Sequence, residues 1–310
     1  MPRAPDNILE GVAFLYKTKD EAEKHARSGG TCFLIGKPIY SNGKFTERYN
    51  PFMVTNRHVA WDMGCPVIRV NRRDGLKPDV IDLDTHDWIV HPDGDDLAIA
   101  SLIGKMDFGI HALRMMPTHK ILTKEQMIEY EIGVGDEVLM PGRFLNHQGS
   151  RDNRPAMRFG CVSMMLENIP HPGLKRNQES FAVEMRSRTG FSGSPVAVYR
   201  QDHSPIVVMK VMSFFGLLGV NWGHIIDPDT GENTWLNGVV PSWKILELLE
   251  VPALSNPHKE VERDFEKMLI LKDGVELAGH IEEVDQTTSQ HKEAFTSLLN
   301  AAARTKPQAD

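Results

Sequence analysis

The sequence predicts an all-β fold. Short apolar runs, such as residues 31–35, 51–55 and 97–102, recur along most of the chain. Polar turns separate them, for example the Ser-Asn-Gly at 41–43, and this alternation is typical of β-sandwiches and β-barrels. A chain of 310 residues with 41% hydrophobic residues can also bury a large core without disulfides or metals.

Charge and composition exclude several classes of function. The formal net charge is −7, with both signs interspersed, so we expect no nucleic-acid partner. No apolar run approaches the length of a membrane span, and residues 1–19 lack the apolar core of a secretory signal. The cysteine count is odd, at three, which suits a reducing compartment. We therefore expect a cytoplasmic protein with no membrane partner, no metal and no cofactor.

The predicted strands fall into two groups joined by a linker at 104–135 that has helical character at 123–132. In the first half, about 8–110, a charged helix is expected at 19–28 and strands at 11–16, 31–35, 51–55, 67–70, 80–83, 88–90 and 97–102. In the second half, about 133–240, strands are expected at 137–141, 157–165, 181–185, 195–199, 206–215 and 234–240.

Helical spacing of apolar residues follows the last strand. Residues 242–250 predict a helix with Ser242 as its N-cap. The more charged segment 251–310 contains two amphipathic stretches, 261–271 and 291–302, and predicts a helical extension with a flexible tail from 305. We expect the extension to pack on the β domain; the alternative is that it docks a regulatory protein partner.

A candidate nucleophile lies in the turn Gly-Phe-Ser-Gly-Ser-Pro at 190–195. Glycines permit a tight turn and keep side chains away from an approaching substrate. The backbone N–H groups of Gly190 and Ser192 could then stabilise an oxyanion. Ser192 is the predicted nucleophile. Ser194 is the alternative on residue type, although its place before Pro195 at a strand start favours a structural role.

A serine nucleophile needs a base and an orienting carboxylate. His58 follows one apolar run and Asp96 precedes another, so the chain order is His, Asp, Ser, as in chymotrypsin-like enzymes. Thr-Asn-Arg-His-Val at 55–59, Asp-Leu-Ala-Ile at 96–99 and the serine turn resemble the motifs of trypsin-like serine proteases. The disulfide-poor bacterial, HtrA-type branch is the most similar.

The resemblance covers residues 8–250 and implies a double six-stranded β-barrel of the chymotrypsin type, here with a C-terminal helical extension. It implies a serine endopeptidase acting on proteins or peptides, with His58 as general base and Asp96 orienting it. The nearby Asp93 and Asp95 are then expected to form the turn. Two alternatives stay open: an esterase with the same triad, and a catalytically silent scaffold that binds a partner.

The resemblance also implies where the substrate pocket lies. Its floor is expected at 185–189 and its wall at 213–216, with Arg186, Thr189, Ser213 and Phe215 as candidate residues. Ser213 also matches a family serine that supports the buried aspartate.

The two arginines at 186 and 188 suggest a substrate preference. A guanidinium in the pocket would favour an acidic side chain on the substrate, unless strand alternation turns both side chains outward. Phe191 stands where zymogen-activated members carry an aspartate, so the resemblance does not imply activation by N-terminal cleavage.

Overall fold

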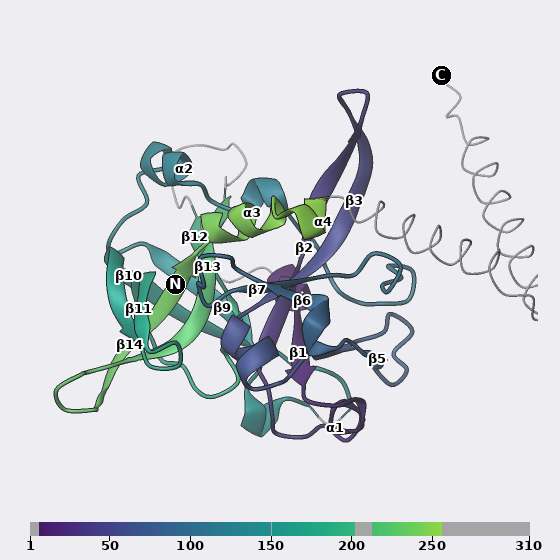
Figure 1. Ribbon diagram of the computed structural model, residues 1–310, viewed down its shortest axis with the longest axis horizontal. Coiled ribbons are helices and arrows are strands. Elements are labelled where there is room, and N and C mark those ends of the chain that lie inside the picture. The colour runs from purple at the N-terminus through teal and green to yellow at the C-terminus, as the bar shows by residue number, and fades with distance from the viewer. Residues whose placement is uncertain (1–5, 150, 202–212, 256–310) are drawn as a thin grey trace, which may run out of the picture. The chain divides into compact units, whose positions relative to one another are not determined.

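Two β-sheets form the framework of the computed structural model, which describes residues 6–149, 151–201 and 213–255 (Figure 1). The first sheet runs in the order β5-β4-β1-β2-β3-β7-β6, and β8 pairs in parallel with β2. Its strands are β1 (Val12–Tyr16), β2 (Thr31–Ser41), β3 (Lys44–Thr55), β4 (Val67–Val70), β5 (Asp79–Ile81), β6 (Trp88–Val90), β7 (Ala98–Ser101) and β8 (Met116–Pro117). This sheet has eight strands, where the resemblance implied six; seven of them match the strands expected from the sequence, and β8 is too short to show a sequence pattern.

The second sheet closes into the six-stranded barrel that was predicted for this half. The closed order is β10-β11-β14-β13-β12-β9, and every neighbouring pair is antiparallel. Its strands are β9 (Glu137–Gly142), β10 (Ala156–His171), β11 (Arg176–Met185), β12 (Pro195–Gln201), β13 (Ser213–Ile226) and β14 (Asn233–Pro241). The all-β class is therefore confirmed, as is the closed six-stranded barrel expected in the second half.

Helices are short and lie outside the sheets. They are α1 (Lys19–Glu23), α2 (Lys124–Glu129), α3 (Trp243–Leu249) and α4 (Pro252–Ser255), with single turns at Asp6–Gly11, His58–Asp62, Thr85–Asp87, Thr118–Lys120 and Leu145–His147. No helix within the described ranges has the length and apolar character needed to cross a membrane. The predicted helices at 261–271 and 291–302, the tail from 305, and most of the strand predicted at 206–215 lie outside the described residues.

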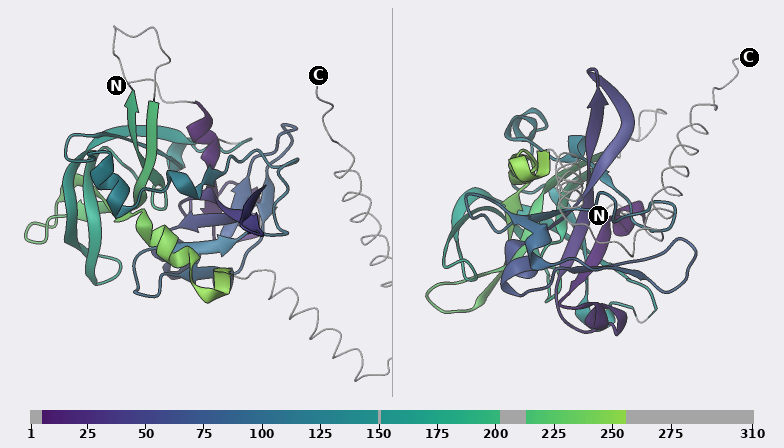
Figure 2. Two further views of the ribbon diagram at one scale, coloured as in Figure 1. Left: turned by 90° about the horizontal axis from the view of Figure 1, so that it is seen from above. Right: turned by 45° about the vertical axis from the view of Figure 1, so that its right-hand side comes forward.

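The closing helix α3 lies along the junction of the two sheets (Figure 2). Its buried residues Ile245 and Leu248 share one apolar cluster with Phe52 of the first sheet and Val220 of the barrel, so α3 stabilises both halves together. Ser242 precedes this helix but does not cap it, because its hydroxyl donates to the Leu122 carbonyl at 2.6 Å. Ser242 therefore occupies the predicted N-cap position, but its side chain makes no capping hydrogen bond.

The cysteines are not paired. Cys32 and Cys65 are both buried in the core of the first sheet, and all three cysteines are free. Burial raises the pKa of the Cys65 thiol to about 11 and raises that of Cys32 as well, so both are neutral thiols at physiological pH. Cys32 and Cys65 therefore form no disulfide in this structure.

A buried arginine joins the two halves beside the serine turn. Arg143 follows β9 and is 0% exposed. Its guanidinium donates to the carbonyls of Leu15 at 2.7 Å and Ala26 at 2.6 Å, and also to the carbonyl of Ser28. It lies 4.1 Å from the centroid of the Tyr16 ring. Burial lowers the pKa of Arg143 to about 10, so the group still carries its charge at neutral pH.

Replacing Arg143 with methionine should therefore destabilise the fold. The change keeps apolar volume but leaves buried carbonyls without donors, and each unsatisfied group costs about 1–3 kcal/mol. We expect a loss of at least about 3 kcal/mol in the free energy of unfolding, measured by urea denaturation. Arg48→Met, at an exposed position of β3, is the control. Equal stability of the two variants would show that the Arg143 network contributes little.

Candidate active site

The predicted histidine and aspartate meet in the structure. His58 Nδ1 lies 2.6 Å from Asp96 Oδ2, and the His58 backbone N–H donates to Asp96 Oδ1 at 2.9 Å. Asn56 donates to the Asp96 carbonyl at 2.9 Å and so holds the backbone of the aspartate in place. Asp96 is 0% exposed. The backbone N–H and the ring Nδ1 of His58 thus both contact the Asp96 carboxylate and fix the imidazole relative to it. Nε2 is left as the ring nitrogen that can act as a base.

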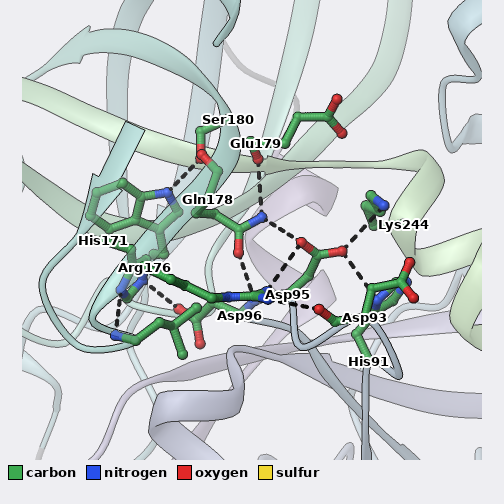
Figure 3. Close-up of polar contacts among 12 residues, drawn as sticks. His91, Asp93, Asp95, Asp96, His171, Arg176, Gln178, Glu179, Ser180 and Lys244 are labelled. Carbon is green, nitrogen blue, oxygen red and sulfur yellow. Dashed lines mark hydrogen bonds and ion pairs between the residues drawn. The ribbon is translucent and has the colours of Figure 1, made fainter. Parts of the chain in front are cut away.

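A second histidine, which sequence reasoning missed, contacts the same carboxylate. His171 is the last residue of β10, and its Nε2 lies 3.1 Å from Asp96 Oδ2 (Figure 3). The Leu174 N–H donates to His171 Nδ1 at 3.1 Å. A neutral His171 therefore carries its proton on Nε2 and donates it to Asp96. The ring packs on Trp222 with centroids 4.4 Å apart. His171 occupies the supporting role that was predicted for Ser213.

The neighbouring Asp95 is buried as well. Gln178 of β11 bridges the two aspartates, accepting from the Asp96 N–H at 3.0 Å and donating to Asp95 Oδ1 at 2.9 Å (Figure 3). Lys244 of α3 lies 3.2 Å from Asp95 Oδ2, and His91 Nδ1 lies 3.1 Å from it. Asp95 thus links α3 to the Asp96 backbone and is more than the turn-forming residue that was predicted.

Asp96 is an ionised carboxylate at neutral pH. Burial by itself opposes ionisation, but the charge of His58 and the hydrogen bonds from His171 and His58 outweigh it. The pKa of the Asp96 carboxyl therefore lies well below its usual range. A group of this kind stabilises the fold at pH values above its unfolded-state pKa, and that contribution is lost only as the pH falls through the lower, folded-state pKa.

Two groups of described residues bring possible metal ligands together. They are His58, Asp96 and His171, and His91, Asp93 and Glu247. Hydrogen bonds account for the approach of the first group. In the second group both carboxylates are on exposed residues. Neither arrangement requires an ion, and the expectation of a metal-free protein stays a prediction.

The serine turn has the backbone that its glycines suggested. Gly190 has φ +105° and Gly193 has φ +85°, values that residues with a Cβ rarely adopt. A Cβ at Gly193 would lie 2.1 Å from the Thr31 carbonyl oxygen. Thr31 also donates its N–H to the Ser192 carbonyl at 2.8 Å and its hydroxyl to the Gly190 carbonyl at 2.7 Å. The first sheet therefore holds the turn directly.

These contacts leave two donors free. Among the described residues, neither the Gly190 N–H nor the Ser192 N–H has a hydrogen-bond acceptor within the protein. Both can therefore donate to an incoming oxygen. The Ser192 hydroxyl is partly exposed and donates to the Trp222 carbonyl at 3.3 Å; it has no hydrogen bond to His58 within the described part of the chain. Ser194 is 0% exposed, which argues against it as the nucleophile.

The predicted pocket residues do not share one cavity. Arg186 and Thr189 line a cavity of about 1980 Å³ at the mouth of the barrel. Phe215 lines another cavity, of about 310 Å³, with Pro195 and Tyr199. Ser213 pairs with Gln201 at the outer end of β13. The predicted wall at 213–216 is therefore wrong.

The β13 segment that passes the nucleophile is instead 221–223, which is Asn-Trp-Gly. The Gly193 N–H donates to the Asn221 carbonyl at 2.9 Å, and the Ser192 hydroxyl contacts the Trp222 carbonyl. The wall was misplaced because Ser213 begins the same strand, and its sequence, Ser-Phe-Phe-Gly, is similar to the Asn-Trp-Gly segment. The Asn-Trp-Gly sequence was the signal that could have found the wall.

Comparison with known proteins supports the fold. No protein-family model and no curated protein matches the sequence. Among solved structures, the apo protease domain of MamO from Magnetospirillum magneticum has a TM-score of 0.50 at 14% identity, covering 79% of this chain and 99% of that one. The HtrA-type protease AlgW with a tripeptide has a TM-score of 0.46 at 18% identity, covering 80% and 62%. Deg5 has a TM-score of 0.46 at 15% identity, covering 80% and 90%.

The likeness to the MamO protease domain agrees with the two sheets and with the fold that the motifs implied. The described domain therefore has the trypsin-like serine protease fold. At 14% identity this likeness shows the fold alone, and the chemistry of the site has to be argued from its own residues.

Proposed function

We propose that the protein is a serine endopeptidase that hydrolyses peptide bonds through an acyl-enzyme on Ser192. The observation that carries the proposal is the buried Asp96 carboxylate 2.6 Å from His58 Nδ1, beside a serine turn with two free N–H groups. Asp96 holds the imidazole with its proton on Nδ1, which leaves Nε2 free to accept a proton from Ser192.

The proposed reaction assigns one role to each of these groups. The Ser192 hydroxyl rotates away from the Trp222 carbonyl and gives its proton to His58 as its oxygen attacks the substrate carbonyl. The new C–O bond places negative charge on the carbonyl oxygen, where the N–H groups of Gly190 and Ser192 stabilise it. His58 then protonates the leaving amine as the C–N bond breaks. Water, deprotonated by His58, hydrolyses the acyl-enzyme in the same manner.

Two other functions use the same residues differently. An esterase would share every step and differ in the leaving group, so peptide and ester substrates of equal sequence separate the two. A silent scaffold would bind partners without forming an acyl-enzyme. The arrangement favours catalysis, because the proposed acyl transfer uses the Asp96–His58 pair and the two free N–H groups of the serine turn together, and a scaffold needs no such combination.

A fluorophosphonate probe tests the proposal. We expect it to label the protein and mass spectrometry to place the adduct on Ser192, because the probe reacts only with a serine activated by a base. Prior heat denaturation should remove the labelling. Labelling of Ser194 would reassign the nucleophile, and a folded protein that neither reacts nor cleaves any peptide would favour the scaffold.

The rate of hydrolysis should rise with pH as His58 loses its proton. Protonated imidazole cannot accept the Ser192 proton, so kcat/KM should be lower at acid pH than at mildly alkaline pH. Asp96 stays ionised throughout this range because its pKa is held well below the usual value, so it should add no second transition. A profile that is flat between about pH 5 and 8 would rule out His58 as the base.

A further inference from the structure

The cavity beside the serine turn is rich in arginine. Arg27, Arg158, Arg186 and Arg188 all line it, and Glu184 is the only acidic residue among the described residues of its lining. Among the described residues, none of the four guanidinium groups forms an ion pair. A concentration of unpaired positive charge in one hollow raises the local concentration of anions and favours their binding.

This cavity lies where a substrate side chain would enter. One wall is 186–189, the segment that leads directly into the Gly190 to Ser192 turn. Another is His224, two residues after Trp222, whose carbonyl contacts the Ser192 hydroxyl. The segment that precedes Ser192 in the chain and the part of β13 next to the Ser192 hydroxyl therefore both contribute walls to the cavity. A peptide with its carbonyl carbon at Ser192 would place the side chain of that same residue in this cavity.

Two groups in the cavity lack partners that burial normally requires. Arg158 is half-buried, and its Nε is buried without a hydrogen-bond acceptor. Its guanidinium lies 5.3 Å from the ring centroid of Phe191, the residue before the nucleophile, and 5.4 Å from that of Phe144. His224 Nδ1 is also buried without a partner. The Arg158 guanidinium thus carries a charge that no described carboxylate neutralises, and an anionic ligand in the cavity would supply the missing negative charge.

We infer that this cavity binds the carboxylate of an acidic side chain, glutamate or aspartate, at the substrate residue that precedes the cleaved bond. The inference rests on the proposed peptidase function. Arg158 supplies a charged donor from the side of Phe191, and Arg186 and Arg188 supply exposed charges at the rim. Charge-assisted hydrogen bonds from a guanidinium to a carboxylate are stronger than neutral ones and discriminate against the amide analogue.

A cleavable peptide is first selected from a library in which the residue before the cleaved bond is varied. The test then compares two versions of this peptide, which carry Glu or Gln at that residue and are otherwise identical. For the wild-type protein we expect kcat/KM for Glu to exceed that for Gln by about ten- to a hundredfold. Arg158→Gln should reduce this ratio by roughly tenfold. Arg188→Gln, at an exposed position, should reduce it by up to about fivefold and serves if Arg158→Gln fails to fold.

Arg48→Gln removes the same charge at an exposed position on β3 outside the cavity and should leave the ratio unchanged. The inference would be overturned if the wild-type protein cleaved the Glu and Gln peptides equally well. It would also be overturned if Arg48→Gln lowered the Glu/Gln ratio as much as the cavity variants do. In both cases the peptidase function stands. Absence of both cleavage and fluorophosphonate labelling would instead overturn the proposed function on which the inference rests.

Discussion

Replacing Ser192 with alanine should abolish peptide hydrolysis and leave the fold intact. The hydroxyl is the atom that forms the acyl-enzyme, and its loss in enzymes of this mechanism lowers kcat on the order of 10⁶-fold. Its single hydrogen bond, to the Trp222 carbonyl at 3.3 Å, is long and partly exposed. The contacts that hold the turn, from the Thr31 hydroxyl to the Gly190 carbonyl and from the Thr31 N–H to the Ser192 carbonyl, do not involve the Ser192 hydroxyl. The melting temperature should therefore stay near that of the wild type.

Ser194→Ala is the matched control, two residues away in the same turn. Ser194 is 0% exposed, and its hydroxyl has no hydrogen-bond partner in the described structure, so its removal should leave kcat within a few-fold of the wild type. Initial rates on a quenched fluorescent peptide, with thermal unfolding of each variant, measure both effects. If Ser192→Ala retained wild-type turnover, the nucleophile would be misassigned.

Asp96→Asn should lower kcat by about 10⁴-fold, for a reason that the hydrogen bonds specify. The His58 backbone N–H donates to Oδ1 at 2.9 Å, so an asparagine must place its amide oxygen on that side. Its NH₂ group then faces the two imidazoles. His58 Nδ1 must accept that proton, which moves the ring proton to Nε2, the atom that must receive the Ser192 proton.

The contact with the His171 imidazole adds a loss of stability to the effect of Asp96→Asn. His171 Nδ1 already accepts from the Leu174 N–H at 3.1 Å, so a neutral His171 has no acceptor to offer the amide through Nε2. Asp96→Asn is therefore expected to lower stability as well as turnover, with the stability loss measurable by denaturation at neutral pH. Asp93→Asn, in the same turn but exposed, is the control. An equal loss of kcat in both variants would mean that Asp96 has no special role.

Several features of this chain could be predicted from local sequence alone. Strand positions followed from short apolar runs with polar turns between them, because side chains of a half-buried strand alternate with the pleat. The capping box at the start of α2, in which Thr123 and Gln126 exchange hydrogen bonds, belongs to the same class of local signal. His58 and Asp96 were also predictable, since each lies in a motif beside a strand, and the structure brings them to 2.6 Å.

Contacts between residues distant in sequence could not be predicted in this way. His171 reaches Asp96 across 75 positions, and the Arg143 guanidinium reaches the Leu15 carbonyl across 128. Neither residue carries a local pattern, because its role depends on which strands become neighbours when the barrel closes. The pocket wall was misplaced because Ser213 and Trp222 both lie on β13; the Asn-Trp-Gly sequence offered Trp222 as a candidate, and the pairing of the strand shows that it is the one that passes Ser192.

The sequence by itself therefore determined the all-β class, the strand positions and the identity of the motif residues, which are properties of short segments. The tertiary structure decided that Asp96 is held by two imidazoles, that Arg143 joins the two halves, and that Arg158 and His224 share a cavity with Arg186. These arrangements depend on burial. The surrounding fold, rather than the adjacent residues in the chain, determines which partners a buried polar group meets.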